Sequence, residues 1–311
     1  MAKHFGCSTK LIYTKCYSYG IKLRQRYFSG NEGVLNTAIS DLHTAFSNSG
    51  SKVGTEALLK IKWKFAVHGC IDGYSRLVLY LKCTTSMTAE TVVSFFANAV
   101  VEFGLPSRVR SDFGYENLFV AMIMNAIRGL SRGSHLTGRS VHNQRIERLW
   151  VDVYTQVIDY FYNEFYNLEY DGLLNIENEK NIFALHKVYL PYINEKLTLF
   201  VNAWNVHKIR TAKSQTPKQL WLYGMLENIN SNLTAISEIF SEQQDLYSRI
   251  INALGIEEVN ENAISVPDIN SHLTVQLDLT EEDEDAIKEV LSSPLNNKQK
   301  YTEIVELLNR N

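Results

Sequence analysis

The chain has 311 residues, a length that allows one large domain or two ordinary ones. With 45% hydrophobic and 21% charged residues it has the composition of a soluble globular protein, and no apolar run approaches the roughly 18 residues that a membrane-spanning helix needs. Residues 225–311 contain 17 acidic and 5 basic side chains, whereas residues 1–224 contain 17 acidic and 26 basic ones. The basic N-terminal part therefore suits a polyanionic partner. The alternative is a basic domain followed by an acidic tail that only keeps the protein solvated.

Two helices are expected within the first 50 residues, over 8–19 and about 32–46. Each range places apolar residues on one side of a helix, and a basic link joins the two ranges. Residues 1–50 are therefore predicted to form a helix-turn-helix-like region, with a generic helical pair as the alternative. Residues 51–60 follow as a linker or as a substitute strand.

Strands and helices alternate through residues 61–224. Runs of β-forming residues on both sides of Asp72 and Gly73 predict a hairpin, and Thr88 or a neighbouring hydroxyl residue is expected to cap the helix that follows. The expected strands lie at 63–71, 77–81, 108–112 and 133–137, and the expected helices at 88–103, 116–127, around Glu147, at 190–204 and from Pro217. This alternation predicts an α/β fold, with a mixed sheet flanked by helices.

Residues 225–311 are expected to form an acidic C-terminal tail of amphipathic helical pieces. The acidic block at 281–285 is expected to be solvated and partly disordered, because a run of like charges cannot be buried.

The cysteines and the N-terminus bear on the cellular compartment. The four cysteines, Cys7, Cys16, Cys70 and Cys83, lack CxxC spacing, and no His/Cys cluster suggests zinc. There is no secretory signal pattern. Free thiols in a reducing compartment are the expectation.

Two carboxylates form the candidate catalytic and metal-binding site. Asp112 follows a short β-strand at a glycine turn, and Glu147 lies just inside the start of a helix. A carboxylate at a strand end and another on a following helix can share a divalent metal site that acts on phosphodiesters. The alternatives are a turn-capping aspartate and a surface ion pair of Glu147 with Arg145 or Arg148.

Basic and amide side chains surround Glu147 in the sequence. They suit contacts with DNA phosphates or bases beside the carboxylates, with helix capping as the alternative for the polar ones. The candidate DNA-binding residues are Arg139, His142, Asn143, Gln144, Arg145 and Arg148. A second basic patch at Lys208, Arg210 and Lys213 is either a further contact surface or a solvated face.

Several motifs in order resemble those of a known family. Residues 71–76, 108–112 and 138–150, followed by Thr216-Pro217, resemble the integrase core, which is the RNase H-like catalytic domain of DDE integrases and transposases. The resemblance covers about 61–223 and is closest to eukaryotic integrase-core proteins derived from mobile elements. It implies an RNase H-like mixed sheet for the catalytic core.

The resemblance also implies a metal site. The family uses two aspartates and a glutamate to hold two Mg²⁺ or Mn²⁺ ions, and motif position makes Asp112 the second and Glu147 the third carboxylate. The first belongs to a central strand carrying Trp-x-x-Asp, and no such segment precedes residue 61. Asp72 and Glu56 are the substitutes considered, although Asp72 lies at a hairpin turn. Either residues 51–60 replace the missing strand or the sheet is compromised.

The same resemblance sets expectations for function and partners. It implies DNA as the partner, action as a homo-oligomer and a nuclear location, with no role for a membrane. The expected activity is metal-dependent polynucleotidyl transfer in DNA integration. The alternative is a DNA-binding protein captured by its host, which has kept the helix-turn-helix and the basic surface and lost the chemistry.

Overall fold

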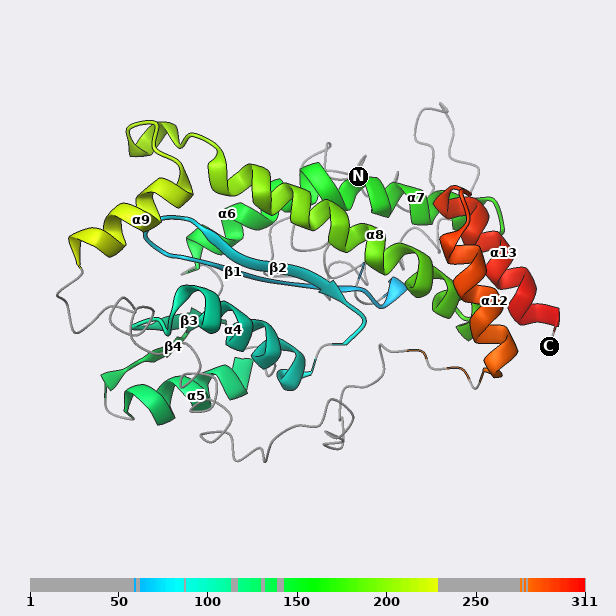
Figure 1. Cartoon of the computed structure of the whole chain (residues 1–311), viewed down its shortest axis with the longest axis horizontal. Helices are drawn as coiled ribbons and strands as arrows, with labels where there is room; N and C mark the ends of the chain where they lie inside the picture. Colours follow the sequence, from blue (N-terminus) through cyan, green and yellow to red (C-terminus); the bar gives the residue numbers. More distant parts are fainter. Residues whose placement is uncertain are drawn as a thin grey trace, which may run out of the picture. The chain divides into compact units, whose positions relative to one another are not determined.

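A computed structural model describes residues 59, 62–86, 88–112, 117–129, 132–138, 143–228, 275, 277 and 279–310 (Figure 1). The helices expected within residues 1–50 and the substitute strand expected within 51–60 therefore lie outside the described residues, apart from Leu59. The chain divides into two compact units. The first comprises Met1–Phe65, Trp150–Ile193 and Val275–Asn311, and the second comprises Ala66–Leu149 and Asn194–Thr274.

The predicted hairpin is present in the second unit. Strand β1 (Ala66–Ile71) pairs antiparallel with β2 (Val78–Thr84), with a bulge at Cys70/Ile71. Asp72 closes the turn between them, because its Oδ2 accepts hydrogen bonds of 2.6 Å from both the backbone N–H and the hydroxyl of Ser75. The turn chemistry of Asp72-Gly73 thus fixes the hairpin, as the sequence predicted.

A helix covers the outer edge of β2. Helix α8 (Glu179–Val206) is longer than the predicted 190–204, and its later part belongs to the second unit. The Asn194 side chain amide accepts from the Cys83 N–H and donates to the Cys83 carbonyl, both at 2.9 Å. Asn205 makes the same pair of bonds to Val78, at 2.9 and 3.0 Å. Two side chain amides therefore take the place of a further strand at this edge.

Two helices and a short parallel sheet complete the described part of the second unit. Helix α4 (Ala89–Phe103) begins at the predicted Thr88 N-cap and lies against β2 and α5 (Leu118–Arg128), which in turn contacts β4. Strands β3 (Val109–Ser111) and β4 (His135–Thr137) pair in parallel, and Figure 1 shows them beside α4 and α5. The core between the two helices consists of Val92, Val93, Phe96, Val100, Leu105, Val120, Ile123 and Met124.

In the described residues, the strands expected in one mixed sheet form two separate two-stranded sheets. Because Cys83 bonds to Asn194 on one side, its register partner Val67 directs its N–H and C=O away from β2. The Val109 N–H bonds to Ser134 and the Ser111 carbonyl to Gly138, so Arg110 directs its backbone groups away from β4. Within the described residues, β1 and β3 each have a single strand partner. Because residues 51–58 and 60 lie outside the described residues, a substitute strand in that segment and a compromised sheet both stay predictions.

An aromatic cluster forms the core of the first unit. Trp63 is fully buried, and its ring makes edge-to-face contacts with Tyr162, Phe165 and Tyr166 at centroid distances of 5.5, 5.3 and 5.0 Å. Its Nε1 donates to Glu169 at 2.6 Å, and its carbonyl oxygen lies 2.8 Å from the Nε2 of His186. Trp63 lies in a helical turn, and not in the strand predicted from residue 63, because these tertiary contacts outweigh its β propensity.

The helices of this cluster are continuous in sequence with the Glu147 helix. Helix α6 (Gln144–Val153) passes through a π-helical turn at Tyr154–Ile158 into α7 (Asp159–Tyr170). Of the helices in the described residues, none is long and apolar enough to cross a membrane.

Two further helices show that the acidic block is not disordered. Helix α12 (Glu281–Ser292) begins with the block, and Thr280 and Asp283 form a reciprocal capping box at its start. The interpretation of the block as partly disordered is therefore wrong, because acidic side chains stabilise a helix N-terminus. Helix α13 (Asn297–Arg310) lies beside α12 in Figure 1, and its fully buried Tyr301 donates a hydrogen bond to the Leu173 carbonyl at 3.1 Å.

Candidate functional site

The two predicted carboxylates lie close together in the second unit. Asp112 is the first residue after β3, and Glu147 lies in the first turn of α6, where its N–H bonds to the Asn143 carbonyl at 3.1 Å. The pKa of Glu147 is raised, first by its partial burial and second by the negative charge of Asp112. The fold thus brings together two acidic side chains that 34 residues separate in the sequence.

Asp112 is held by neighbours that the sequence analysis did not single out. The Asn117 side chain amide donates to Asp112 Oδ1 at 3.1 Å, and the Ser111 hydroxyl donates to the Asp112 carbonyl at 2.9 Å. His135 on β4 lies 3.3 Å from the same hydroxyl. Because burial lowers the pKa of His135, its imidazole is neutral near pH 7. The parallel pairing of β3 with β4 places this histidine beside Ser111, and no local pattern in the sequence indicates that pairing.

The alternative roles of the two carboxylates can be weighed against these contacts. An arginine paired with Glu147 would lower the pKa of the glutamate, whereas burial and Asp112 raise it. The geometry therefore favours a site of two neighbouring acidic groups. Such a pair is stabilised when a cation lies between its members.

The two substitutes for a third carboxylate differ in what the structure says of them. Asp72 is committed to the hairpin turn through two bonds to Ser75. Glu56 lies outside the described residues. In the part of the chain that the structure describes, no three His, Cys, Asp or Glu side chains are grouped so as to hold a metal ion.

Two carboxylates nonetheless fit a single hard cation. Mg²⁺ is commonly bound through one or two carboxylates, with waters and substrate phosphates filling its other positions. The donor set of Asp112 and Glu147 meets that requirement. It offers no third side chain to bridge a second ion.

The predicted DNA-binding residues cluster at the start of α6. Gln144, Arg145 and Arg148 are exposed and Asn143 is half-buried, whereas Arg139 and His142 lie outside the described residues. Arg145 lies near enough to Arg76 that their repulsion contributes to lowering the pKa of Arg76, after burial. Exposed arginines therefore lie on the same helix as Glu147, close to it in the sequence.

The described elements define an α/β protein in which a strand end and a helix start present neighbouring carboxylates beside exposed arginines. A comparison with protein-family models matches residues 43–235 to the integrase core domain. The match covers more than half of the chain, so the chain belongs to the integrase core domain family, and the resemblance noted in the sequence is confirmed. Comparisons with curated proteins and with solved structures found no match.

Family membership supports a function related to DNA integration and an interaction with DNA. Integrase core domains generally use divalent metal ions. The mixed α/β structure, mostly helical with small sheets, is consistent with that family.

Proposed function

We propose that this protein carries out metal-dependent polynucleotidyl transfer on DNA, with Asp112 and Glu147 as the metal-binding carboxylates. The observation that carries the proposal is that the end of β3 and the first turn of α6 bring Asp112 near enough to Glu147 for its negative charge to help raise the pKa of Glu147. Two like charges held close together are unfavourable unless a cation neutralises them, so their proximity supports a cation site.

The protein's own groups have distinct tasks in this proposal. Asp112 and Glu147 would bind Mg²⁺ or Mn²⁺, and Asn117 orients Asp112 through its bond to Oδ1. A divalent cation there would lower the pKa of a bound water or hydroxyl and offset the charge that develops on the phosphate. Arg145 and Arg148, exposed on α6, would hold the DNA backbone beside the carboxylates.

A second function has its own supporting observation. In the described residues, β1 and β3 belong to separate sheets and no third carboxylate joins the pair. A non-catalytic DNA-binding protein needs neither a continuous catalytic sheet nor a third carboxylate. In that case contacts with phosphates would dominate, and binding would weaken steeply with salt.

One experiment separates the two functions. The full chain is incubated with supercoiled DNA and Mn²⁺, and nicking and strand transfer are measured for the wild type, Asp112→Asn and Glu147→Gln. Glu102→Gln, an exposed position on α4 in the same unit, is the matched control. Activity that is lost in the two site variants and kept in the control supports polynucleotidyl transfer.

The other outcomes are equally decisive. Salt-sensitive DNA binding without turnover, unchanged in both site variants, supports the non-catalytic function. If neither binding nor turnover is detected, both functions are wrong.

A further inference from the structure

A short stretch of the second unit is strongly basic and contains a loop that a backbone hydrogen bond closes. Residues 196–226 contain five basic and no acidic side chains. Within this range a 3₁₀ turn (Arg210–Ala212) precedes Lys213, and the Ile209 N–H bonds to the Gln215 carbonyl at 2.9 Å. Ile209 is buried and holds the loop in place, while the side chains of Lys208, Arg210 and Lys213 are exposed to solvent.

The turn of the β1–β2 hairpin is attached to this loop. Arg76 Nη1 donates to the Thr211 hydroxyl at 3.2 Å, and the Arg76 carbonyl accepts from Trp204 Nε1 at 3.0 Å. The backbone N–H of Arg76 bonds to Asp72 at 3.0 Å. Arg76 is therefore held at its main chain and at its guanidinium, and it adds a fourth cation to those of the loop.

The backbone of this region is unusual. Arg76 has a φ of 65°, and Lys213 and Ser214 have φ values of 53° and 59°. Of the four residues other than glycine with positive φ in the described part of the chain, these are three. Such conformations cost free energy and persist where the surroundings impose them, commonly at binding sites.

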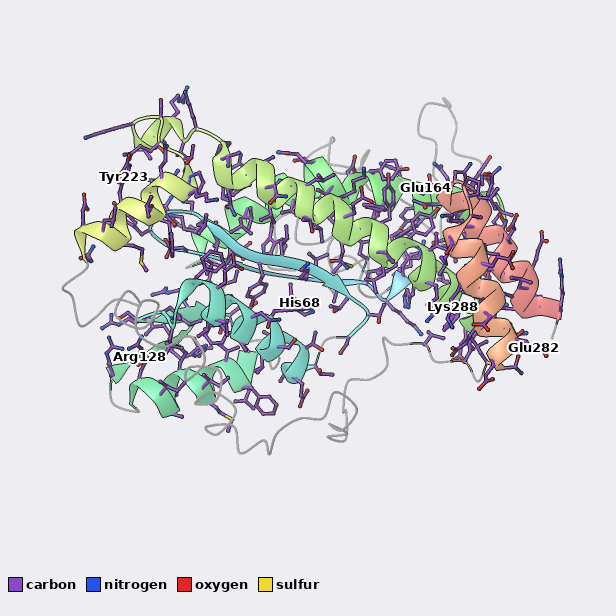
Figure 2. All side chains as sticks on the ribbon, viewed as in Figure 1. His68, Arg128, Glu164, Tyr223, Glu282 and Lys288 are labelled. Atoms are coloured by element: carbon purple, nitrogen blue, oxygen red, sulfur yellow. The ribbon has the colours of Figure 1, made fainter. Side chains whose placement is uncertain are left out.

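An exposed aromatic ring lies next to these cations. Tyr74, two residues before Arg76, is 66% exposed. A Cβ on Gly224 of α9 (Pro217–Glu227) would lie 3.1 Å from Tyr74 Cε1, so the ring rests against the α9 backbone and would have to shift by a few tenths of an ångström to admit a side chain there. Figure 1 shows α9 beside the hairpin turn, and Figure 2 labels Tyr223 on the same helix, which is 47% exposed.

The positive charges of this region have no acidic counterpart among the described residues. Within the described residues, no carboxylate forms an ion pair with Arg76, Lys208, Arg210 or Lys213. Arg76 in addition faces the positive charge of Arg145 on α6. Cations that are gathered and left without acidic partners fit a polyanion, and an exposed ring fixed among them fits a flat base.

We infer that Tyr74, Arg76, Lys208, Arg210 and Lys213 form a surface that binds single-stranded nucleic acid. The four cations hold successive phosphates, and the Tyr74 ring stacks on an unpaired base. A base within a duplex is already stacked on its neighbours and cannot use the ring, so the surface distinguishes single strands from duplexes. The inference rests on the proposed DNA function and assigns it a second contact surface, away from the Asp112 turn in sequence.

Binding of a labelled mixed-sequence oligonucleotide and of its duplex to the full chain tests the inference. The assay contains EDTA, so the result does not depend on metal binding or turnover. Because base stacking on an aromatic ring contributes about 1–3 kcal/mol, Tyr74→Ala should weaken single-strand binding about 5- to 150-fold and leave duplex binding nearly unchanged. Tyr74→Phe keeps the ring and should retain the wild-type affinity.

Further variants separate stacking from charge and from folding. Gly224→Ala pushes on the Tyr74 ring without removing a charge and should weaken single-strand binding. Arg76→Asn, chosen because asparagine tolerates left-handed backbone, should reduce the salt dependence of single-strand binding by about 0.7 in the log–log slope. Tyr170→Ala, at a 74% exposed position in the first unit, is the control that should change nothing.

The inference is overturned if Tyr74→Ala leaves single-strand binding unchanged, or weakens single-strand and duplex binding equally while Tyr74→Phe fails to restore either. The proposed function fails separately. If turnover is absent or insensitive to Asp112→Asn while single-strand binding still depends on Tyr74, the surface stands and the chemistry does not.

Discussion

Replacing Asn194 by alanine should destabilise the second unit, because this side chain amide takes the place of a strand along β2. The substitution leaves the Cys83 N–H and C=O without the partners that lie at 2.9 Å in the folded protein. A buried polar group left unpaired costs about 1–3 kcal/mol. Since these bonds are only partly buried, two groups near the low end of that range give a loss of about 2–3 kcal/mol.

The loss should be visible in thermal unfolding. At about 2–4 °C per kcal/mol for a unit of this size, Asn194→Ala should lower the Tm by about 5–10 °C. Asn205→Ala removes the equivalent bonds to Val78 and should have a similar effect. The two positions are three helical turns apart, so the effects should add in the double variant.

A matched control makes the result interpretable. Asn202→Ala changes the same residue type on the same helix at an exposed position, and it should leave the Tm nearly unchanged. Because the chain has two units, amide hydrogen exchange at Val78 and Cys83 should accompany the melting curves. If Asn194→Ala costs no more than Asn202→Ala and the Cys83 amide stays protected, the amides do not stabilise the edge of β2.

Three further predictions concern titration and exchange. Because the folded-state pKa of Glu147 is raised, the folded protein binds more protons than the unfolded chain just above the ordinary glutamate pKa, and its stability falls as the pH rises through that range. Glu147→Gln should therefore have a higher Tm than the wild type at pH 7 and the same Tm at low pH. The variant should also lose the stabilisation that Mn²⁺ gives the wild type. Burial lowers the pKa of His186 to about 4, so the stability that its neutral form contributes is present above the ordinary histidine pKa near 6.5 and is lost as the pH falls toward 4; urea unfolding of His186→Gln should lack this loss. The amides of Val67 and Gly69, directed away from β2, should exchange faster than that of Cys70, and equal protection at the three positions would contradict the open edge of β1.

Local chemistry made much of the fold predictable. The Asp72-Gly73 turn, the Thr88 cap and the Thr216-Pro217 start of α9 each depend on residues within a few positions, and the structure places all of them as expected. The acidic block is largely exposed, as its charge predicted, but the expectation of partial disorder was wrong because its position behind Thr280 begins a helix. Composition alone does not distinguish a solvated run from a well-capped helix start.

Non-local contacts were beyond prediction from the sequence. Nothing near Asn194 in the chain indicates that its amide bonds to β2, and no pattern connects Arg76 with Thr211 across the chain. The pairing of Asp112 with Glu147 was predicted from ordered motifs, and not from periodicity. Tyr74 was part of a turn signal, and no local pattern indicates that its exposed ring rests against Gly224 of α9.

In the described residues, the separation of the two sheets and the set of only two carboxylates meet at the same place in the fold. Val67 and Gly69 on β1 and Arg110 on β3 direct backbone groups away from their only described strand partners. The resemblance noted in the sequence implies that a strand between them carries the first carboxylate, so the absence of that one strand would account for both features. A segment that restored the ladder would bring a ligand next to Asp112, whereas a segment that merely capped the edges would stabilise the unit and leave the cation site with two carboxylates. The stability of the sheet and the ability to catalyse are therefore separable properties. A variant that gains one of them without the other would show which of the two the wild-type chain lacks.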